Sequence, residues 1–288
     1  MTVSVMITTR DRSGDLRRTL AKVVQLNPAA DEVIVTADGC RDDTVEMIRN
    51  EFPSVKLRIN ETGKGSVASR DAMLREASSD LVLSLDDDSY PENPDCLVRI
   101  IQLFRSNSKL AVAHFPQRSD EYPASLTQTD FGAPRITNSF ANSGACYRRK
   151  TYLELPGFPL FFFHAYEEPD YALQCVAAGL DVLYYPGVVV RHHFTTVMRN
   201  EIRTHQRHAR NEWWSIWLRC PWPYAILLLI YRPLSELRYA IRRGPSWVIR
   251  EPLWWWDALK GVSRCIQERS PLAWKSYIRW LLLNKVQR

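Results

Sequence analysis

The sequence predicts an α/β fold built on a mostly parallel β-sheet, with a helical extension at its C-terminal end. Three observations support this prediction: short apolar runs alternate with helix-period segments through the first 90 residues, polar side chains follow those runs, and the composition changes near Arg191. Strands that alternate with helices usually pair in parallel, because each helix crosses the sheet before the next strand begins. With 288 residues, 45% of them hydrophobic, the chain can bury a sizeable core.

The elements of the first half follow from the period of their apolar residues. Four short runs of β-branched and aliphatic residues are predicted as strands, at residues 3–8, 32–36, 55–59 and 81–85. Apolar residues at helical spacing predict helices between them, at residues 13–25, 45–51 and 66–77. Polar groups emerge after the first, second and fourth strands. They should meet at the carboxyl edge of the sheet, where open α/β sheets bind their ligands.

The most informative segment is LVLSLDDDSY, at residues 81–90. A buried strand here ends in Asp86, Asp87 and Asp88, whose like charges repel one another and require a positive partner nearby. Divalent cations such as Mg²⁺ or Mn²⁺ take oxygen ligands and are often bound together with substrate phosphates. An arbitrary triplet of aspartates is more often a solvated acidic turn. A buried strand directly precedes this triplet, and polar residues follow the earlier strands. Both observations favour a cation site instead.

The net charge of +6 hides a difference between the two parts of the chain. From Arg191 onward, Lys and Arg outnumber Asp and Glu by 18 to 6, whereas the first 190 residues carry 20 basic and 26 acidic side chains. All ten tryptophans also lie after residue 190, the first being Trp213. We therefore expect one domain over residues 1–194 and a basic, Trp-rich helical extension over residues 195–288.

Cysteine use and hydropathy favour a cytoplasmic location. The six cysteines are widely spread and form no CxxC pair, which argues against a zinc site or a disulfide framework and suits a reducing compartment. The first residues, MTVSVMI, lack the basic start and long apolar region of a signal peptide. No run approaches the roughly 20 apolar residues that span a bilayer, and the longest candidate covers only residues 224–231.

Four short segments, in order and at matching intervals, resemble the motifs of one enzyme family. They are VSVMITTR near the start, VTADGCRDDT after the second strand, GKGSVASRD at the third helix, and the aspartate triplet. Together they resemble the family-2 glycosyltransferases, which have the GT-A fold, and the likeness covers residues 3–195. The resemblance implies a GT-A catalytic domain in which residues 1–90 bind the nucleotide of a nucleotide-diphospho-sugar and residues 91–194 bind the acceptor.

The resemblance also implies which residues contact the nucleotide. Thr8 and Arg10 match the loop after the first strand, and Asp38 matches the acid that accepts a hydrogen bond from a base N–H. Arg70 lies in the helix motif near the nucleotide, where it is expected to place positive charge near the phosphates, with Lys64 as a second candidate. Two plainer interpretations remain open: Arg10 as an ordinary surface arginine and Asp38 as a turn former.

The metal ligands are expected from two separate segments. In the aspartate triplet, Asp86 matches the residue that bonds the ribose hydroxyls, Asp87 belongs with the nucleotide-sugar contacts, and Asp88 is expected to ligate Mn²⁺ or Mg²⁺. Residues 181–185 and 188–190 are predicted as strands, and in many relatives a histidine after the second one approaches the metal. His192 matches that position, although a surface histidine pair is the alternative.

The segment YEEPDYALQCVAAG, at residues 166–179, is predicted to be a helix that carries the catalytic base. Pro169 suits its first turn and Gly179 its end. A sugar acceptor hydroxyl must lose a proton as it attacks the anomeric carbon, and a nearby carboxylate can take that proton. The family motif here is E-D-x-D-L-x-x-R-x-x-x-x-G, whose base position falls on Glu168.

The base assignment leaves alternatives. Glu167 or Asp170 could act in place of Glu168, and all three could be plain capping acids at the positive end of a helix dipole. This segment also departs from the family motif twice. Glutamate replaces the commoner aspartate at the base, and Gln174 replaces an arginine, which removes a cation.

The segment SFANSGACY, at residues 139–147, is small and polar. It is consistent with either an acceptor pocket or a glycine turn before a strand, and the residues favour neither interpretation.

The C-terminal extension is predicted to consist of helices broken by prolines. Its clusters WWSIWL and LWWW combine tryptophan with nearby arginine. The extension could pack on the catalytic domain, or it could lie on an anionic membrane surface, since Trp with Lys and Arg is typical of interfacial helices. A nucleic-acid site is disfavoured because the basic residues are scattered among bulky apolar ones.

These observations predict a metal-dependent, inverting hexosyl- or deoxyhexosyltransferase that moves a sugar from a nucleotide-diphospho-sugar to an acceptor hydroxyl. The expected acceptor is a polysaccharide, a lipid-linked glycan or another cell-surface glycan precursor, met in the cytoplasm or at the cytoplasmic face of the membrane. A nucleotidyltransferase on a similar fold is one alternative, although no glycine- and lysine-rich loop follows the first strand. A non-catalytic protein that binds sugar nucleotides or membranes is another.

Overall fold

An eight-stranded mixed sheet is the centre of the computed structural model, which describes residues 1–193 and 200–283. The strand order is β3-β2-β1-β4-β9-β6-β10-β8, and only β9 and β8 run antiparallel to their neighbours. The strands are β1 Val3–Thr9, β2 Glu32–Asp38, β3 Lys56–Asn60, β4 Leu81–Asp86, β6 Leu110–His114, β8 Arg135–Ile136, β9 Gly144–Arg148 and β10 Asp181–Tyr184.

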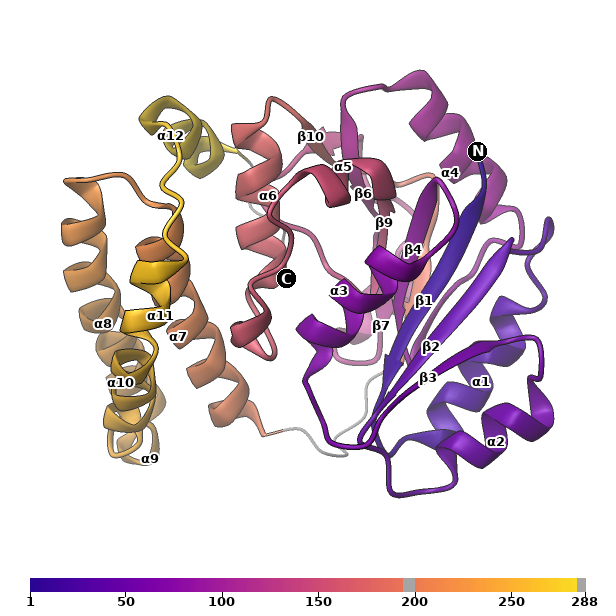
Figure 1. The fold of residues 1–288 in the computed structure, drawn as a ribbon, viewed down its shortest axis with the longest axis horizontal. Coiled ribbons are helices and arrows are strands. Elements are labelled where there is room, and N and C mark those ends of the chain that lie inside the picture. The colour runs from indigo at the N-terminus through magenta and orange to yellow at the C-terminus, as the bar shows by residue number, and fades with distance from the viewer. Residues whose placement is uncertain (194–199, 284–288) are drawn as a thin grey trace.

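The predicted alternation of strands and helices through the first 90 residues is confirmed. Helices α1 (Ser13–Val23), α2 (Thr44–Glu51) and α3 (Ser66–Glu76) connect the parallel strands β1 to β4 (Figure 1). The register sets Thr8 opposite both Thr36 and Asp86, so the carboxyl ends of β1, β2 and β4 are level. The loops that carry the expected nucleotide contacts therefore leave the sheet at one edge.

The two faces of the sheet carry separate cores, because successive strand residues point to opposite sides. On one face, Val5 and Ile7 of β1 pack among side chains of α1, α2 and α4. On the other face, Met6 of the same strand packs among side chains of α3, α5 and α6. The bounds of the further helices are α4 Cys96–Ser106, α5 Arg149–Glu154 and α6 Glu167–Ala177, with 3₁₀ turns at Pro123–Thr127 (η1) and Leu160–Phe162 (η2).

A small three-stranded sheet beside the main one changes one predicted boundary. The strand expected at residues 188–190 is β11, Val190–His192, which pairs antiparallel with β5 (Ser89–Pro91) and parallel with β7 (Gln117–Ser119). The predicted strand began and ended two residues too early. Pairing with β5 and β7, and not the local apolar run, determines where β11 begins and ends. The pairing sets His192 opposite Ser89, next to the aspartate triplet.

The C-terminal extension is helical, as predicted, and forms a separate layer beside the sheet domain (Figure 1). The predicted domain boundary at residues 194–195 lies outside the described residues. The helices are α7 Glu201–Arg219, α8 Tyr224–Arg243, α9 Pro245–Val248, α10 Glu251–Lys260, α11 Val262–Gln267 and α12 Trp274–Leu282.

The inner side of this layer packs on the catalytic domain. Helices α7 and α12 both contact α6, while α8 and α10 lie against α7. The indole N–H of Trp280 in α12 donates to the carbonyl of Asn138 at 2.7 Å, and that of Trp214 in α7 donates to Ala258 of α10 at 2.8 Å. The bond of Trp280 to Asn138 and the packing of Trp214 against Phe161, with ring centres 5.2 Å apart, confirm for these two tryptophans that the extension packs on the catalytic domain.

Prolines divide the layer as expected, with one exception. Pro221, Pro223 and Pro271 lie in the links between helices, but Pro233 lies inside α8 without ending it. Among the described helices, none combines the length and the hydropathy needed to cross a bilayer.

Candidate active site

The aspartate triplet lies where β4 leaves the sheet. Asp86 is the last residue of β4, and its side chain is 28% exposed. Asp87 and Asp88 form the turn into β5 and are buried, with side chains 6% and 1% exposed. The solvated acidic turn is therefore wrong, since two of the three carboxylates are withdrawn from water.

Arg12, at the start of α1, is the positive partner of the two buried carboxylates. Its Nη1 lies 2.6 Å from Asp87 Oδ1, and its Nη2 lies 2.6 Å from Asp88 Oδ2. The hydroxyl of Thr9 donates to the other oxygen of Asp87 at 2.9 Å. A guanidinium fork suits this role because it presents several donors in one plane. From the sequence, a metal was expected as the partner of the triplet, and Arg12 was not singled out.

This environment shifts the pKa values of the two buried carboxyl groups in opposite directions. Burial raises the pKa of Asp87 to about 7, although Arg12 opposes the shift. Asp88 is also buried, but His192 and Arg12 outweigh that burial and lower its pKa to about 2. A carboxyl group that stays ionised while buried is a suitable ligand for a cation.

Asp86, Asp88 and His192 form a group that fits a divalent cation. One ligand atom from each lies within 4.8 Å of the others. Nε2 of His192 is 3.1 Å from Asp88 Oδ1, and its Nδ1 is 3.0 Å from the amide oxygen of Gln117. With that oxygen as acceptor, Nδ1 carries a proton, so Nε2 is the nitrogen that pairs with Asp88 and the one that would ligate a bound cation. Two carboxylates and an imidazole suit Mn²⁺.

Asp38, at the end of β2, holds the glycine loop that precedes α3. Its carboxylate accepts hydrogen bonds from the Asn60 side chain at 2.7 Å and from the backbone N–H groups of Lys64 and Gly65 at 2.9 and 2.8 Å. Gly65 has a φ of +90°, and a Cβ there would lie 2.2 Å from the carbonyl of Phe163. Asp38 is thus more than a simple turn former, and its contact with a base stays a prediction.

Thr8 and Arg10 lie at the same edge of the sheet. Thr8 is half-buried opposite Asp86, whereas Arg10 is 46% exposed and its guanidinium lies against Gly63. Arg207 of α7 is a further cation at this edge. Burial, and next the charges of Arg203 and Arg10, lower its pKa, so Arg207 lies within electrostatic range of Arg10. The guanidinium of Arg207 also lies 5.2 Å from the centre of the Phe163 ring.

Arg70 of α3 connects the aspartate triplet to the start of α6. One end of its guanidinium forms an ion pair with Asp86, and Nη1 lies 3.0 Å from Glu167 Oε1. Although burial opposes the charge, the carboxylates of Asp86, Glu167 and Glu168 raise the pKa of Arg70. Arg70 therefore stays cationic in the interior of the site.

The three acids at the start of α6 have different surroundings. Glu167 is buried, and its Oε1 also accepts from Asn142 at 3.2 Å. Asp170 is buried and accepts from Ser215 and Gln174, each at 2.7 Å. Glu168 is half-buried. Of the three candidates, Glu167 and Asp170 are held inside the protein by several partners.

Asp170 also explains the departure from the family motif at Gln174. Nη2 of Arg219, at the end of α7, lies 3.3 Å from Asp170 Oδ2. The cation that the motif supplies within the helix comes here from another helix.

The loop before α6 has an uncommon backbone. Phe163, Ala165 and Tyr166 all have positive φ values, at +66°, +72° and +68°. Such residues persist only where their surroundings hold them. Asn211 of α7 does so: its buried side-chain amide lies within 2.7 to 3.1 Å of the carbonyl oxygens of residues 162, 164 and 165.

Four residues that contact the candidate site were not predicted from the sequence: Arg12, Gln117, Asn142 and Asn211. Arg12 could have been predicted, because it is a cation in the loop after β1, at the same edge of the sheet as the aspartate triplet. The other three lie far along the chain from their partners, and neither residue type nor spacing distinguished them. Asn142 lies in the segment left open above, which is a turn that enters the antiparallel strand β9.

Comparison with known proteins identifies the family of this chain. Residues 2–211 match the family described as Glycosyltransferase like family 2. The chain is 23% identical over 268 residues to the O-antigen chain rhamnosyltransferase RfbN of Salmonella typhimurium, a match that covers 87% of this chain and 85% of that protein. It is 26% identical over 239 residues to the O-antigen chain rhamnosyltransferase WbaN of Salmonella anatum, covering 75% and 74%.

Solved structures share the fold at low sequence identity. The mannosyltransferase PcManGT from Pyrobaculum calidifontis, in complex with GDP-Man and Mn²⁺, superposes with a TM-score of 0.59 at 17% identity, over 97% of this chain and 84% of that one. S. aureus TarS 1-349 with UDP-GlcNAc gives 0.62 at 14% identity, over 92% and 82%. GalNAc-T7 with UDP, GalNAc and Mn²⁺ gives 0.66 at 13% identity over 82% of this chain, which spans 51% of GalNAc-T7. The chain therefore has the GT-A fold, and it belongs to the family-2 glycosyltransferases, a family of sugar-transferring enzymes.

Proposed function

We propose that this enzyme transfers a sugar with inversion from a nucleotide-diphospho-sugar to an acceptor hydroxyl, with a divalent metal at Asp86, Asp88 and His192 and with Glu168 as general base. The observation that carries the proposal is the link made by Arg70. It ties Asp86, the last residue of β4, to Glu167, the first residue of α6, which supports a single site for the metal group and Glu168. The family match favours sugar transfer over the nucleotidyltransferase and the binding protein considered from the sequence.

The donor would be held at the carboxyl edge of β1, β2 and β4. Asp38 would accept a hydrogen bond from the base, and Thr8 would contact the nucleotide. The exposed guanidinium of Arg10 lies beside the glycine loop, where it could approach the phosphates. A divalent cation at Asp86, Asp88 and His192, Mn²⁺ or Mg²⁺, would stabilise the negative charge that develops on the leaving nucleoside diphosphate. Asp87 contributes by fixing Arg12, which orients Asp88.

Glu168 would remove the proton from the acceptor hydroxyl. The acceptor oxygen forms its bond to the anomeric carbon as the bond from that carbon to the diphosphate breaks, and the proton passes to the Glu168 carboxylate. A single displacement from the face opposite the leaving group inverts the anomeric configuration. The buried neighbours Glu167 and Asp170 hold α6 in place through Arg70, Asn142, Ser215 and Arg219. Glu168 stands at the base position of the family motif and is half-buried, which supports this role.

The relatives suggest the class of sugar and acceptor. Two of them are named O-antigen chain rhamnosyltransferases, so we propose a deoxyhexose such as rhamnose as the sugar, and a lipid-linked or other cell-surface glycan as the acceptor. An acceptor of this kind would be met at the cytoplasmic face of a membrane. Asp38 does not choose among uracil, thymine and guanine, because each of these bases offers an N–H group.

Product analysis tests the proposal. The enzyme is incubated with Mn²⁺, an acceptor glycan and UDP-, dTDP- or GDP-linked sugars. The expected products are one nucleoside diphosphate and a glycosidic bond whose anomeric configuration, read by NMR, is opposite to that of the donor. Retained configuration would overturn the single-displacement mechanism, and release of pyrophosphate would overturn glycosyl transfer.

A further inference from the structure

Helix α8 exposes an apolar stripe along the side that faces away from the catalytic domain. Leu227, Ile230, Leu234 and Ile241 are 60–62% exposed, and Tyr231 between them is 60% exposed. Their spacing of three or four residues, repeated along the helix, sets them on one face. On the opposite face, Ala225, Glu236 and Ala240 are buried. Soluble monomers rarely leave a contiguous apolar surface of this kind in water, so the stripe requires a partner.

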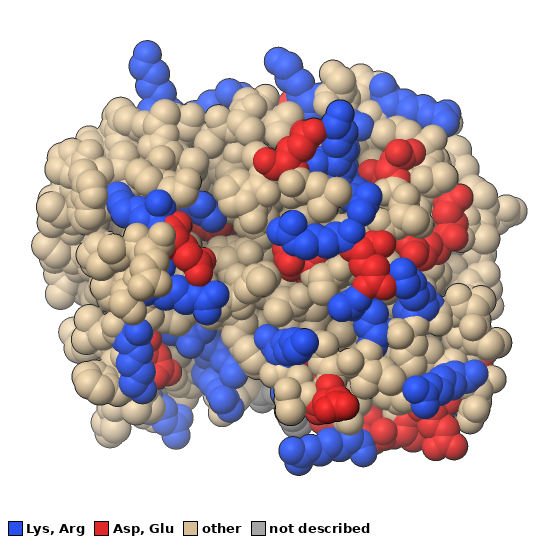
Figure 2. Space-filling view, in the orientation of Figure 1, with Lys and Arg blue, Asp and Glu red and all other residues tan. Residues whose placement is uncertain are grey.

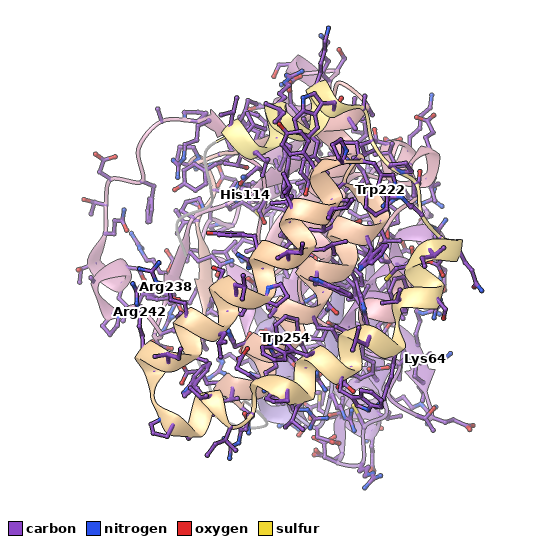
Figure 3. The ribbon with its side chains drawn as sticks, turned by 90° about the vertical axis from the view of Figure 1, so that its left-hand side faces the viewer. Lys64, His114, Trp222, Arg238, Arg242 and Trp254 are labelled. Carbon is purple, nitrogen blue, oxygen red and sulfur yellow. The ribbon has the colours of Figure 1, made fainter. Side chains whose placement is uncertain are left out.

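Helix α10 extends this surface. Leu253, Trp256 and Leu259 are 60%, 62% and 58% exposed, while Trp254 and Ala258 on the other side of the helix are buried against α7. Figure 3 looks onto this side of the molecule: α8 runs across the front, with Trp222 near its first residue and Arg238 and Arg242 towards its end. We call the exposed apolar residues of α8 and α10 the outer face.

Cations border the outer face. Arg238 and Arg242 on α8 and Arg250 before α10 are exposed, and among the described residues no carboxylate forms an ion pair with any of the three. Lys260 lies over the ring of Trp256, at 5.5 Å from its centre. On the face drawn in Figure 2, most Asp and Glu side chains lie over the sheet half of the molecule. The pattern of an apolar stripe bordered by arginine, lysine and aromatic rings is that of a helix in a bilayer interface.

Charge decides between a membrane and a second copy of the chain as the partner. Two copies joined through their outer faces would bring the same arginines together, and repulsion would oppose the contact. Anionic lipid head groups would instead neutralise them. The first 190 residues carry 26 acidic and 20 basic side chains, so the same lipid surface would repel the sheet domain and turn the outer face towards the bilayer.

We propose that the outer face of α8 and α10 binds the surface of an anionic lipid bilayer, with its apolar side chains among the acyl chains and its arginines at the head groups. Helix α7 transmits this placement to the active site. One side of α7 packs on α8 and α10, and the other carries Asn211 and Arg207, which contact the loop before Glu168. The enzyme would thus meet a lipid-linked acceptor at the bilayer surface. This last step rests on the proposed function, whereas bilayer binding does not.

Flotation with lipid vesicles tests the proposal without any assay of transfer. Wild-type protein should float with vesicles of phosphatidylcholine and phosphatidylglycerol, and should bind vesicles of phosphatidylcholine alone at least tenfold more weakly. Leu234→Glu sets a charge in the centre of the outer face and should reduce binding about tenfold. Leu153→Glu is the matched control: Leu153 is 41% exposed on α5 of the sheet domain, and its replacement should leave binding unchanged.

A second variant guards against misfolding of the first. Arg238→Gln with Arg242→Gln keeps the apolar stripe and should weaken binding to anionic vesicles about fivefold for each arginine removed, with a smaller dependence on salt. Nucleotide binding should be unchanged in all these variants, which separates loss of bilayer contact from loss of the active site. Equal binding of Leu234→Glu and wild type would overturn the proposal. If wild-type protein does not bind vesicles, the proposal is also overturned. This holds both for a monomer and for a dimer that Leu234→Glu converts into monomers.

Discussion

Asp170 in the first turn of α6 and Arg219 in the last turn of α7 form a buried ion pair, with 3.3 Å between Oδ2 and Nη2 and both side chains at most 6% exposed. The pair joins the helix that carries Glu168 to the first described helix of the C-terminal layer. It also supplies from α7 the cation that the family motif would supply from the position of Gln174. This ion pair therefore connects the catalytic domain to the C-terminal layer two residues after the proposed base.

Removing the Asp170 charge should destabilise the protein while leaving the base in place. Asp170→Asn leaves Arg219 buried without its counter-ion, and breaking a buried pair on one side typically costs about 3–5 kcal/mol. Urea unfolding should show this loss, and Asp170→Asn combined with Arg219→Met should recover part of it. If Asp170→Asn instead unfolds like wild type and abolishes transfer, then Asp170 and not Glu168 is the base.

Glu168→Gln should fold and bind nucleotide normally but lose transfer. A positioned general base typically contributes about 10²- to 10⁴-fold to the rate, and the amide cannot accept the proton. We expect kcat to fall by at least that lower limit, with little change in the affinity for the nucleotide. Glu46→Gln, at an exposed glutamate in the first turn of α2, is the matched control and should be fully active. A fully active Glu168→Gln would remove Glu168 from the mechanism.

Asn211 is a positioning residue for Glu168. Asn211→Ala deprives three loop carbonyls of their donor and lets the left-handed residues 163, 165 and 166 relax. A small displacement of a reacting group can cost about 10²-fold in rate. We therefore expect kcat to fall while the KM for the donor stays within a factor of a few.

The control for Asn211→Ala is Asn200→Ala. Asn200 caps the start of α7 by accepting from Arg203 N–H at 3.0 Å, and its loss should cost about 1 kcal/mol of stability without an effect on kcat. If both variants lose stability and neither loses kcat, the loop does not position the base.

His114 should make the fold sensitive to mild acid. Burial, and next the charge of Arg135, lower the pKa of this histidine to about 3, and its Nε2 lies 3.0 Å from the hydroxyl of Thr137. An unfolded histidine binds a proton below about pH 6.5, whereas the native one stays neutral. The stability due to His114 is therefore complete above about pH 6.5 and is lost as the pH falls towards 3, by up to about 1.4 kcal/mol per pH unit.

The measurement for His114 is the urea midpoint at several pH values between 8 and 4. His114→Gln can keep a donor towards Thr137 but does not titrate, so its midpoint should fall less steeply with pH than that of wild type. Parallel curves for the two proteins would show that another group controls the acid sensitivity.

The parts of this structure that were predicted from sequence depend on local patterns. The period of apolar residues located β1 to β4 and α1 to α3 to within a few residues, because neighbours in the chain determine those elements. The triplet of aspartates after β4 marked the edge of the sheet that carries the site. His192 was placed by its likeness to the family motif, and the structure brings it within 3.1 Å of Asp88.

The parts that were not predicted depend on contacts between distant residues. Strand β9 enters the sheet antiparallel between β4 and β6, which the small polar segment before it did not indicate. The partner of Asp170 lies 49 residues away on another helix, and Asn211 lies 46 residues from Ala165. Residue types alone do not predict which distant residues form such contacts, because many other arginines and asparagines in the chain could form the same bonds.

The most direct test of the account is calorimetric titration of UDP, dTDP and GDP, each with and without Mn²⁺, into wild type and Asp88→Ala. We predict that one nucleotide binds wild type tightly only when Mn²⁺ is present, and that Asp88→Ala loses this dependence on metal together with most of the affinity. Tight binding that is equal with and without Mn²⁺, and unchanged in Asp88→Ala, would contradict a metal site at Asp86, Asp88 and His192.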